Sequence, residues 1–231
     1  MMVRGTDSPT FALYEDGRVI FCTSYAPHTV GTAWEKESAY ATFVLDEAAR
    51  KKLLGSALGD DPGAFAKLDA TYTLSTSTDQ TTSTVHVWVG GERHSVSVYG
   101  QMRDRSGDAR KAAPVAFLAA FDAAAGYAEP AAVAWNPTQL EVMFTDFSYA
   151  KWEPVKWPED WPGLDDPTTR KFRDDYYWIH LDAKHHDRLL ALLRGLERHF
   201  GEASQAVELG KRNWGVDFRR PFPAEELWMN K

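Results

Sequence analysis

Short apolar runs flank a turn dipeptide near the start of the chain and predict a β-hairpin. Residues 11–15 and 18–22 lie on either side of Asp16-Gly17, a pair that accepts the positive φ angles of a two-residue type I′ turn. With that turn, one face of the hairpin carries Phe11, Leu13, Ile20 and Cys22. Because both faces are apolar, we expect this hairpin to lie deep in a sheet.

A second hairpin is predicted by alternation of apolar and polar residues around Gly90-Gly91. It pairs Val85 with Val96 and places Val87, Val89 and Val98 on the same face. The opposite face carries Thr84, His86, Trp88, Arg93, Ser95 and Ser97. One dry face and one polar face are typical of an antiparallel sheet with one solvated side.

Two helices with clear boundaries are predicted in the same half. Residues 40–45 have strand composition and lead into Asp46, which is expected to cap a helix over residues 47–58 that ends at Gly59. A further helix over residues 114–125 begins with proline and is followed by glycine.

The second half of the chain has a similar order of elements. Strands are predicted over residues 140–147 and 176–181, and the second runs into Asp182 and a helix reaching Phe200. That helix has an apolar stripe of Leu189, Leu192, Leu193, Leu196 and Phe200. A last hairpin joins residues 207–209 to 214–218 through a turn around Lys211-Arg212.

Together these elements predict an α+β protein with two similar halves, each an antiparallel β-sheet with a helix packed on one face. Superposing Leu45-Asp46 on Leu181-Asp182 also aligns the helices and hairpins that follow, which indicates an internal duplication. The halves are residues 1–135 and 136–231. Alternatively, a strand, an Asp cap and a helix form so common an arrangement that two copies arise independently.

The segment 152–166 differs from the rest, because it has three prolines, three tryptophans, and five acidic residues against one lysine. Its prolines predict an irregular connector. Tryptophan is over-represented at binding hot spots, and an acidic rim steers a basic partner. The predicted partner-binding residues are Trp152, Trp157, Glu159, Asp160, Trp161, Asp165 and Asp166. The alternative is that the indoles fold back over the chain's own core.

The opening pattern Phe11-x-Leu13-Tyr14-x-Asp16-Gly17-x-Val19, together with a Thr-rich stretch and the run from Val96 to Gly100, resembles uncharacterised bacterial domains that begin with the same hairpin. The resemblance covers about the first hundred residues and consists mostly of turn and strand chemistry. Those domains have no assigned activity, so the resemblance supports the fold and implies no functional residue. Many of them are attached to secreted proteins.

Composition limits the functional classes. The chain has 231 residues, 44% of them hydrophobic, and a net charge of −7, which argues against nucleic acid as a partner. It has no apolar run long enough for a membrane span, and its opening residues lack the apolar core of a signal peptide. We therefore expect a cytoplasmic protein, or a secreted one if a leader has been removed. The single cysteine excludes a disulfide framework.

Catalytic motifs are absent: there is no Walker or dinucleotide loop, no Gly-x-Ser-x-Gly and no His-Glu-x-x-His. The alternative metal site is His180, Asp182 and His185, at a strand-to-helix junction where they would suit zinc, iron or manganese. Because Asp182 aligns with Asp46, capping is the simpler role for it. Cys22 and His28 are close in sequence, but the hairpin register predicts a buried, inert thiol.

These features favour a non-enzymatic protein-binding module with a basic protein partner and no cofactor. A bacterial inhibitor or a toxin-neutralising immunity protein is the class they fit. The alternatives are a metal-dependent hydrolase using His180, Asp182 and His185, or a structural subunit that extends a sheet through the Thr-rich edge at residues 71–84. Nothing in the sequence indicates the oligomeric state.

Overall fold

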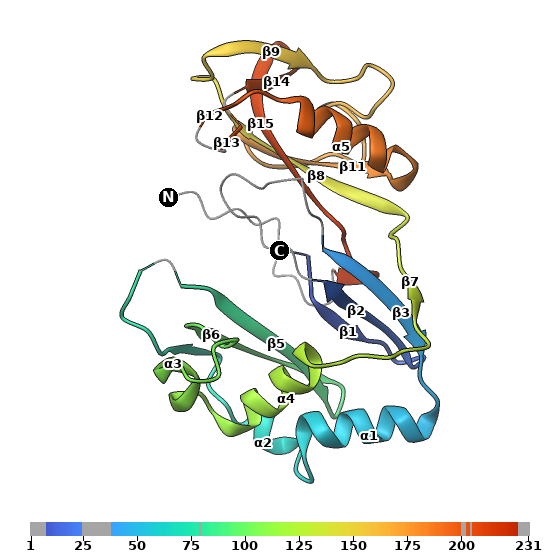
Figure 1. Ribbon diagram of the computed structural model, residues 1–231, viewed down its shortest axis with the longest axis vertical. Coiled ribbons are helices and arrows are strands. Elements are labelled where there is room, and N and C mark those ends of the chain that lie inside the picture. The colour runs from blue at the N-terminus through green and yellow to red at the C-terminus, as the bar shows by residue number, and fades with distance from the viewer. Residues whose placement is uncertain (1–7, 25–37, 79, 200–201, 204, 226–231) are drawn as a thin grey trace. The chain divides into compact units, whose positions relative to one another are not determined.

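The computed structural model describes residues 8–24, 38–78, 80–199, 202–203 and 205–225, and divides the chain into two compact units (Figure 1). The C-terminal unit comprises the described residues of Met1–Pro9, Cys22–Ala41 and Val133–Ala224. The N-terminal unit comprises those of Thr10–Phe21, Thr42–Ala132 and Glu225–Lys231. Both units therefore collect segments from separate parts of the sequence.

The predicted hairpin around Gly90-Gly91, called the glycine hairpin below, belongs to a three-stranded sheet of the N-terminal unit with strand order β4-β6-β5. Its strands are β4 (Thr71–Thr73), β5 (Thr82–Val89) and β6 (Glu92–Tyr99). Val85 pairs with Val96 as predicted, and both Gly90 and Gly91 have positive φ angles. Because β4 and β5 lie at the two edges, the Thr-rich segment supplies both outer strands of this sheet.

Four helices accompany this sheet: α1 (Glu47–Leu58), α2 (Gly63–Ala66), α3 (Asp108–Ala112) and α4 (Val115–Ala125). The Asp46 side chain accepts a hydrogen bond from the backbone N–H of Ala49 at 2.7 Å, which confirms the predicted cap. Phe117 of α4 packs with Val96 and Val98 of β6 in one buried apolar cluster. The dry face of the glycine hairpin therefore faces α4.

The first hairpin has a different register from the predicted one. Strand β1 (Phe11–Leu13) pairs antiparallel with β2 (Arg18–Ser24). The partners are Phe11 with Phe21, Ala12 with Ile20 and Leu13 with Val19. In the loop only Gly17 has a positive φ, +84°, so the turn has three residues and a glycine bulge instead of a type I′ pair. Relative to β1, every paired residue of β2 therefore lies on the face of the hairpin opposite to the predicted one.

Gly17 also lies close to the backbone of Leu45. The backbone carbonyl of Gly17 accepts a hydrogen bond from the N–H of Leu45, and a Cβ at Gly17 would lie 2.7 Å from the Leu45 carbonyl oxygen. The sheet order is β1-β2-β3-β7, with β3 (Ala39–Val44) and β7 (Val133–Ala134). Burial follows this order: residues 19–21 of β2 are buried, whereas β1 is an edge strand and only half-buried.

The C-terminal unit is built on a six-stranded sheet of order β10-β11-β8-β15-β14-β9. Its strands are β8 (Gln139–Asp146), β9 (Trp152–Lys156), β10 (Arg170–Arg173), β11 (Tyr176–Asp182), β14 (Gln205–Leu209) and β15 (Arg212–Arg219). All neighbours are antiparallel except β14 and β9, which are parallel. A separate pair, β12 (Arg198–His199) and β13 (Glu202–Ala203), is antiparallel.

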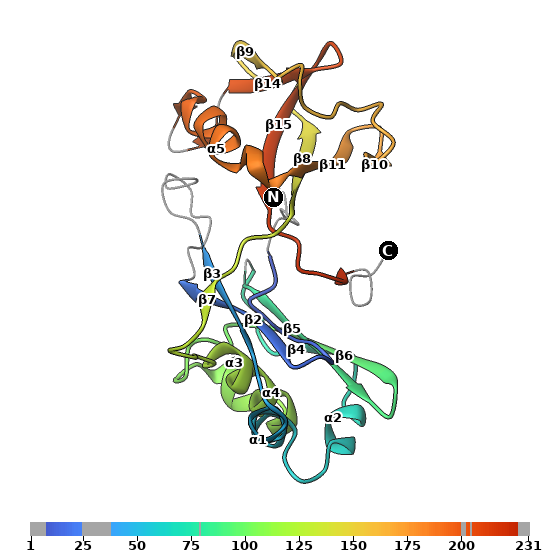
Figure 2. The ribbon, with the colours of Figure 1, turned by 90° about the vertical axis from the view of Figure 1, so that its right-hand side faces the viewer.

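One face of this sheet is covered by a helix. The short 3-10 turn η1 (Ala183–His185) leads into α5 (His186–Gly195), which lies beside β15 and β8 in Figure 2. Leu189 and Leu193 of α5 are fully buried in a cluster with inward-facing residues of β8, β11 and β15. The helix ends before the predicted boundary at Phe200, because Leu196 is extended and β12 begins at Arg198. Phe200 lies outside the described residues.

The fold class is α+β, as predicted, with helices and predominantly antiparallel sheets. The internal duplication is not confirmed. The long hairpin of the N-terminal unit stands in a three-stranded sheet, whereas the last hairpin of the C-terminal unit is embedded in six strands. Each sheet has one parallel pair, β4 with β6 and β14 with β9. Both units have the shared order of strand, Asp cap and helix, and its origin in a duplication stays a prediction.

Candidate functional site

The predicted partner-binding segment is irregular only in part. Residues 152–156 form the edge strand β9, and the N–H of Trp157 continues the pairing by donating to the Glu208 carbonyl at 2.9 Å. Pro154, which lacks a backbone N–H, is tolerated there because an edge strand needs hydrogen-bond donors on one side only. Residues 152–156 are therefore part of the C-terminal sheet, which corrects the expectation drawn from the prolines, whereas residues 157–166 have no regular structure, as predicted.

Trp157 and Trp161 are buried, each 5% exposed, and belong to the core of the C-terminal unit. Their ring centroids lie 4.8 Å apart, and Trp157 also packs edge-on against Phe144 of β8 at 4.9 Å. The Trp157 Nε1–H donates to the Pro162 carbonyl at 2.9 Å. The assignment of these two indoles to a binding surface was wrong, because a buried ring offers no area to a partner.

The acidic residues of the segment have different roles. Asp160 forms a bidentate ion pair with Arg188 of α5, and these hydrogen bonds hold the pKa of the Asp160 carboxyl below its usual range. Asp166 accepts hydrogen bonds from the backbone N–H and the hydroxyl of Thr168, which also lower its pKa. Glu159 and Asp165 are exposed. These two acids are thus available as a charged rim.

His180, Asp182 and His185 bind three different partners. His180 Nε2 faces a Glu141 oxygen at 3.7 Å, and Asp182 accepts from the backbone N–H of Lys184 at 2.9 Å. His185 Nδ1 accepts from Trp161 Nε1–H at 3.2 Å. Within the described ranges, His, Cys, Asp and Glu side chains nowhere form a group of three or more that could hold a metal ion. The alternative metal site is therefore not formed, and Asp182 is a cap, as its alignment indicated.

Two exposed aromatic side chains, Tyr149 and Trp152, lie on the segment from the end of β8 to the start of β9, and sequence reasoning identified only Trp152. Tyr149 is 68% and Trp152 is 51% exposed, and the Phe147 ring packs edge-on against Tyr149 at 4.9 Å. Glu153, also exposed, follows directly in β9. We call Phe147, Tyr149, Trp152 and Glu153 the β8–β9 surface. The available signal was the aromatic run after strand 140–147, which the sequence analysis read only as the end of that strand.

A buried row of charges crosses the sheet face opposite α5, and sequence reasoning missed it. Glu141 of β8 pairs in register with His180 of β11 on one side and with Arg219 of β15 on the other. Glu141 and Arg219 form an ion pair, and both side chains are buried. Burial lowers the pKa of His180, partly offset by the Glu141 carboxylate, whereas Arg170 and Arg219 lower it further.

Trp178 lies beside this row, and the Arg219 guanidinium is 4.8 Å above its ring. The Trp178 Nε1 is buried and has no hydrogen-bond partner among the described residues. A buried ion pair of this kind costs desolvation energy. Stacking of the Arg219 guanidinium on the Trp178 indole is favourable, because a guanidinium is only weakly hydrated. Only the cross-strand register brings these residues together, so no local sequence pattern signals them.

The polar face of the glycine hairpin is arranged as predicted. Trp88 lies opposite Arg93, and His86 Nδ1 hydrogen-bonds the Ser95 hydroxyl at 2.8 Å. Cys22 is half-buried, not fully buried as the predicted register implied, and His28 lies outside the described residues. No catalytic pair with Cys22 is therefore defined.

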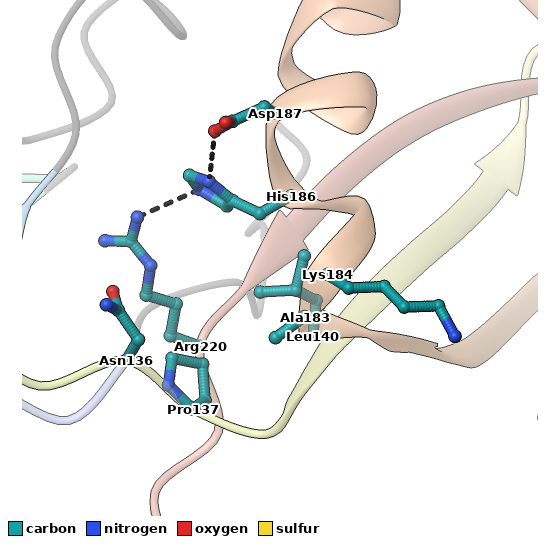
Figure 3. A pocket seen from close by; sticks show the side chains of 8 residues that line it. All are labelled: Asn136, Pro137, Leu140, Ala183, Lys184, His186, Asp187 and Arg220. Carbon is teal, nitrogen blue, oxygen red and sulfur yellow. Dashed lines mark hydrogen bonds and ion pairs between the residues drawn. The ribbon is translucent and has the colours of Figure 1, made fainter.

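The C-terminal unit also contains a cavity of about 330 Å³ beside the start of α5 (Figure 3). Its lining residues come from the segment before β8, from β8, from η1 and α5, and from the residue after β15. They are Asn136, Pro137, Leu140, Ala183, Lys184, His186, Asp187 and Arg220. Arg220 Nη2 lies 3.0 Å from His186 Nε2, and His186 Nδ1 lies 3.2 Å from an Asp187 oxygen. His186 and Asp187 directly follow His185 of the alternative metal site and have no predicted role.

Comparisons with known proteins give no identification: no family model, no curated protein and no solved structure matches this chain. None of the helices in the described part of the chain has the length and apolar character that a bilayer span requires.

Proposed function

We propose that the protein is a non-enzymatic protein-binding module, of the class of bacterial inhibitors and toxin-neutralising immunity proteins, with a basic protein as partner. The observation that carries the proposal is the exposure of Tyr149 and Trp152 on the β8–β9 surface. Tyrosine and tryptophan supply large contact areas with few rotatable bonds, which is why they dominate binding energy at interfaces.

Charge supports a basic partner. Glu153 belongs to the β8–β9 surface, Glu159 and Asp165 are exposed on the segment that follows β9, and the whole chain has a net charge of −7. An acidic rim around aromatic anchors speeds association with a basic surface and makes that rate dependent on salt.

The position of β9 supports the same role. As the last strand in the sheet order, β9 has hydrogen-bonding groups on the side away from β14. An extended segment of the partner can pair there, with Pro154 limiting that pairing to the remaining donors and acceptors. The aromatic residues would then supply affinity and the strand edge would set the register.

The test is affinity capture from the native host, read by mass spectrometry, with three forms of the protein. The wild type is compared with the double variant Tyr149→Ala/Trp152→Ala and with Val115→Ala as a control. Val115 is 84% exposed on α4 of the N-terminal unit, so its truncation removes an exposed apolar side chain outside the proposed surface.

We expect the wild type and the Val115→Ala variant to retain a basic protein that the double variant loses. Its association rate should fall as ionic strength rises, and Glu153→Lys should slow it further. Retention of the same protein by the double variant at wild-type level would exclude the β8–β9 surface. Failure of the wild type to retain any basic protein would contradict the function itself.

A further inference from the structure

Strand β5 is an edge strand without the usual protection against pairing with another chain. Natural proteins keep edge strands short, or place prolines, charged side chains or bulges on them. Among the edge strands that the structure describes, β9 contains Pro154, β10 has three cations and a register shift, and β1, β4, β7, β12 and β13 have three residues or fewer. Strand β5 has eight residues in continuous register with β6, and none of them is proline, glycine, lysine, arginine or an acid. Its outer edge is therefore open to a further strand.

The register of the glycine hairpin determines which backbone groups of β5 face outward. A two-residue turn makes Val89 and Glu92 a hydrogen-bonded pair, and such pairs recur at every second residue. The Gly100 N–H donates to the Thr81 carbonyl at 3.0 Å, which continues the same alternation beyond the other end of β5. Odd-numbered residues of β5 therefore bond β6, and even-numbered ones point away from it. The outward N–H and C=O groups without a partner among the described residues are those of Thr82, Thr84 and His86.

The dry face of the sheet is incomplete at the same edge. Val96 and Val98 of β6 are 1% and 0% exposed. Val85 and Val87 of β5 pack against the same cluster, which includes Phe117 of α4, but they are only half-buried. A strand added beside β5, with apolar side chains on the α4 face, would remove the remaining valine surface from water, which is favourable.

A second copy of the chain supplies such a strand. Across a twofold axis the outward-facing groups of one β5 bond those of the other in antiparallel order, so even-numbered residues pair with even-numbered ones. The odd-numbered residues then also lie opposite each other, which places the valines of both copies together on the α4 face and Thr84 and His86 on the polar face.

Charge also favours a second copy over the basic partner of the β8–β9 surface. Strand β5 offers a basic protein no acidic side chain, and it brings no lysine, arginine or acid of its own against its symmetry mate. Burial and the Arg93 charge lower the pKa of His86, so this ring is neutral at pH 7. We propose that the protein forms a twofold dimer through antiparallel β5–β5 pairing, which joins the two three-stranded sheets into one of six strands.

Sedimentation velocity of the full chain at about 5–500 µM, a range in which micromolar dissociation constants are measurable, tests this proposal. The wild type should form a species with twice the 26.0 kDa mass of one chain. Thr84→Lys places a cation on the open edge and should raise the dimer dissociation constant at least about tenfold. The matched control is Thr71→Lys. Thr71 and Thr84 are both exposed and both lie opposite Ser97, but Thr71 belongs to β4 at the other edge, so this variant should dimerise like the wild type.

Amide hydrogen exchange of the wild type, measured by NMR, decides the question if Thr84→Lys does not fold. The N–H groups of Thr84 and His86 point away from β6, so they should exchange at least about tenfold more slowly at the highest protein concentration than at the lowest. The Val85 N–H bonds β6 in the monomer and should be protected at both concentrations. A monomeric wild type over the whole range, an equal loss of dimer in Thr71→Lys, or equal exchange of the Thr84 N–H at both concentrations would overturn the proposal. Strand β5 shares no residue with the β8–β9 surface, so either proposal can fail alone.

Discussion

Replacing Trp157 by alanine should destabilise the protein strongly, whereas the same change at Trp152 should not. The Trp157 ring is 5% exposed and has edge-on contacts with Phe144 at 4.9 Å and Trp161 at 4.8 Å. Tryptophan-to-alanine changes in a core cost about 3–5 kcal/mol, and each aromatic pair contributes about 0.5–1.5 kcal/mol to such a loss. The carbonyl of Pro162 also loses its hydrogen bond from Nε1.

We expect Trp157→Ala to lower the free energy of unfolding by about 4 kcal/mol, or the melting temperature by about 10 °C for a chain of this size. Trp152 is 51% exposed, so Trp152→Ala should cost no more than about 0.5 kcal/mol. Urea unfolding followed by circular dichroism at a backbone wavelength measures both variants without relying on indole fluorescence. If the two variants unfold within about 1 kcal/mol of each other, the assignment of Trp157 to the core is refuted.

The remaining predictions concern single positions in the two units. Gly17→Ala should destabilise the protein by more than about 1 kcal/mol, because φ is +84° and a Cβ would lie 2.7 Å from a backbone oxygen. Gly55→Ala inside α1 should stabilise the protein by about 0.5–1 kcal/mol. A reversal of this order in urea unfolding would contradict the turn geometry. Burial lowers the pKa of His180 from 6.5, so the imidazole is protonated more readily in the unfolded chain than in the folded one. As the pH falls below 6.5, the wild type should therefore lose stability that His180→Gln retains. Parallel dependences of the free energy of unfolding on pH in the two proteins would exclude this linkage. Arg219→Met should lower the free energy of unfolding by about 3–5 kcal/mol, because it leaves the Glu141 carboxylate buried without its cation. The same change should cost much less in combination with Glu141→Leu. Additive losses in this double-mutant cycle would rule out coupling of the pair.

The sequence predicted those features that depend on neighbouring residues. The Asp46 cap and the boundaries of α1 were correct, because a cap and a stop glycine act within one helical turn. The hairpin around Gly90-Gly91 was also correct, because two glycines with positive φ determine a two-residue turn. At Asp16-Gly17 the same reasoning failed by one residue, since the contact of Gly17 with Leu45 favours a wider turn that the local sequence does not show.

The candidate sites depend on long-range pairing and were predicted less well. Trp157 and Trp152 have similar sequence surroundings, but only the former lies over β8, so composition could not separate a core indole from a surface indole. Arg220 meets His186 only because β15 runs beside β8 and ends next to the start of α5. Such encounters follow from strand order, and a single sequence carries no direct signal for the order of six strands.

The strand order of the C-terminal sheet has a consequence for synthesis on the ribosome. Strand β8 lies between β11 and β15, and β15 is the last strand of the chain to be translated among those described. Until Arg219 has left the exit tunnel, the nascent β8 lacks one of its two neighbours, and its apolar residues Leu140, Val142 and Phe144 have no complete core to enter. Folding of this unit is therefore expected to wait for the synthesis of β15, with a period in which chaperones that bind extended apolar segments have access to β8.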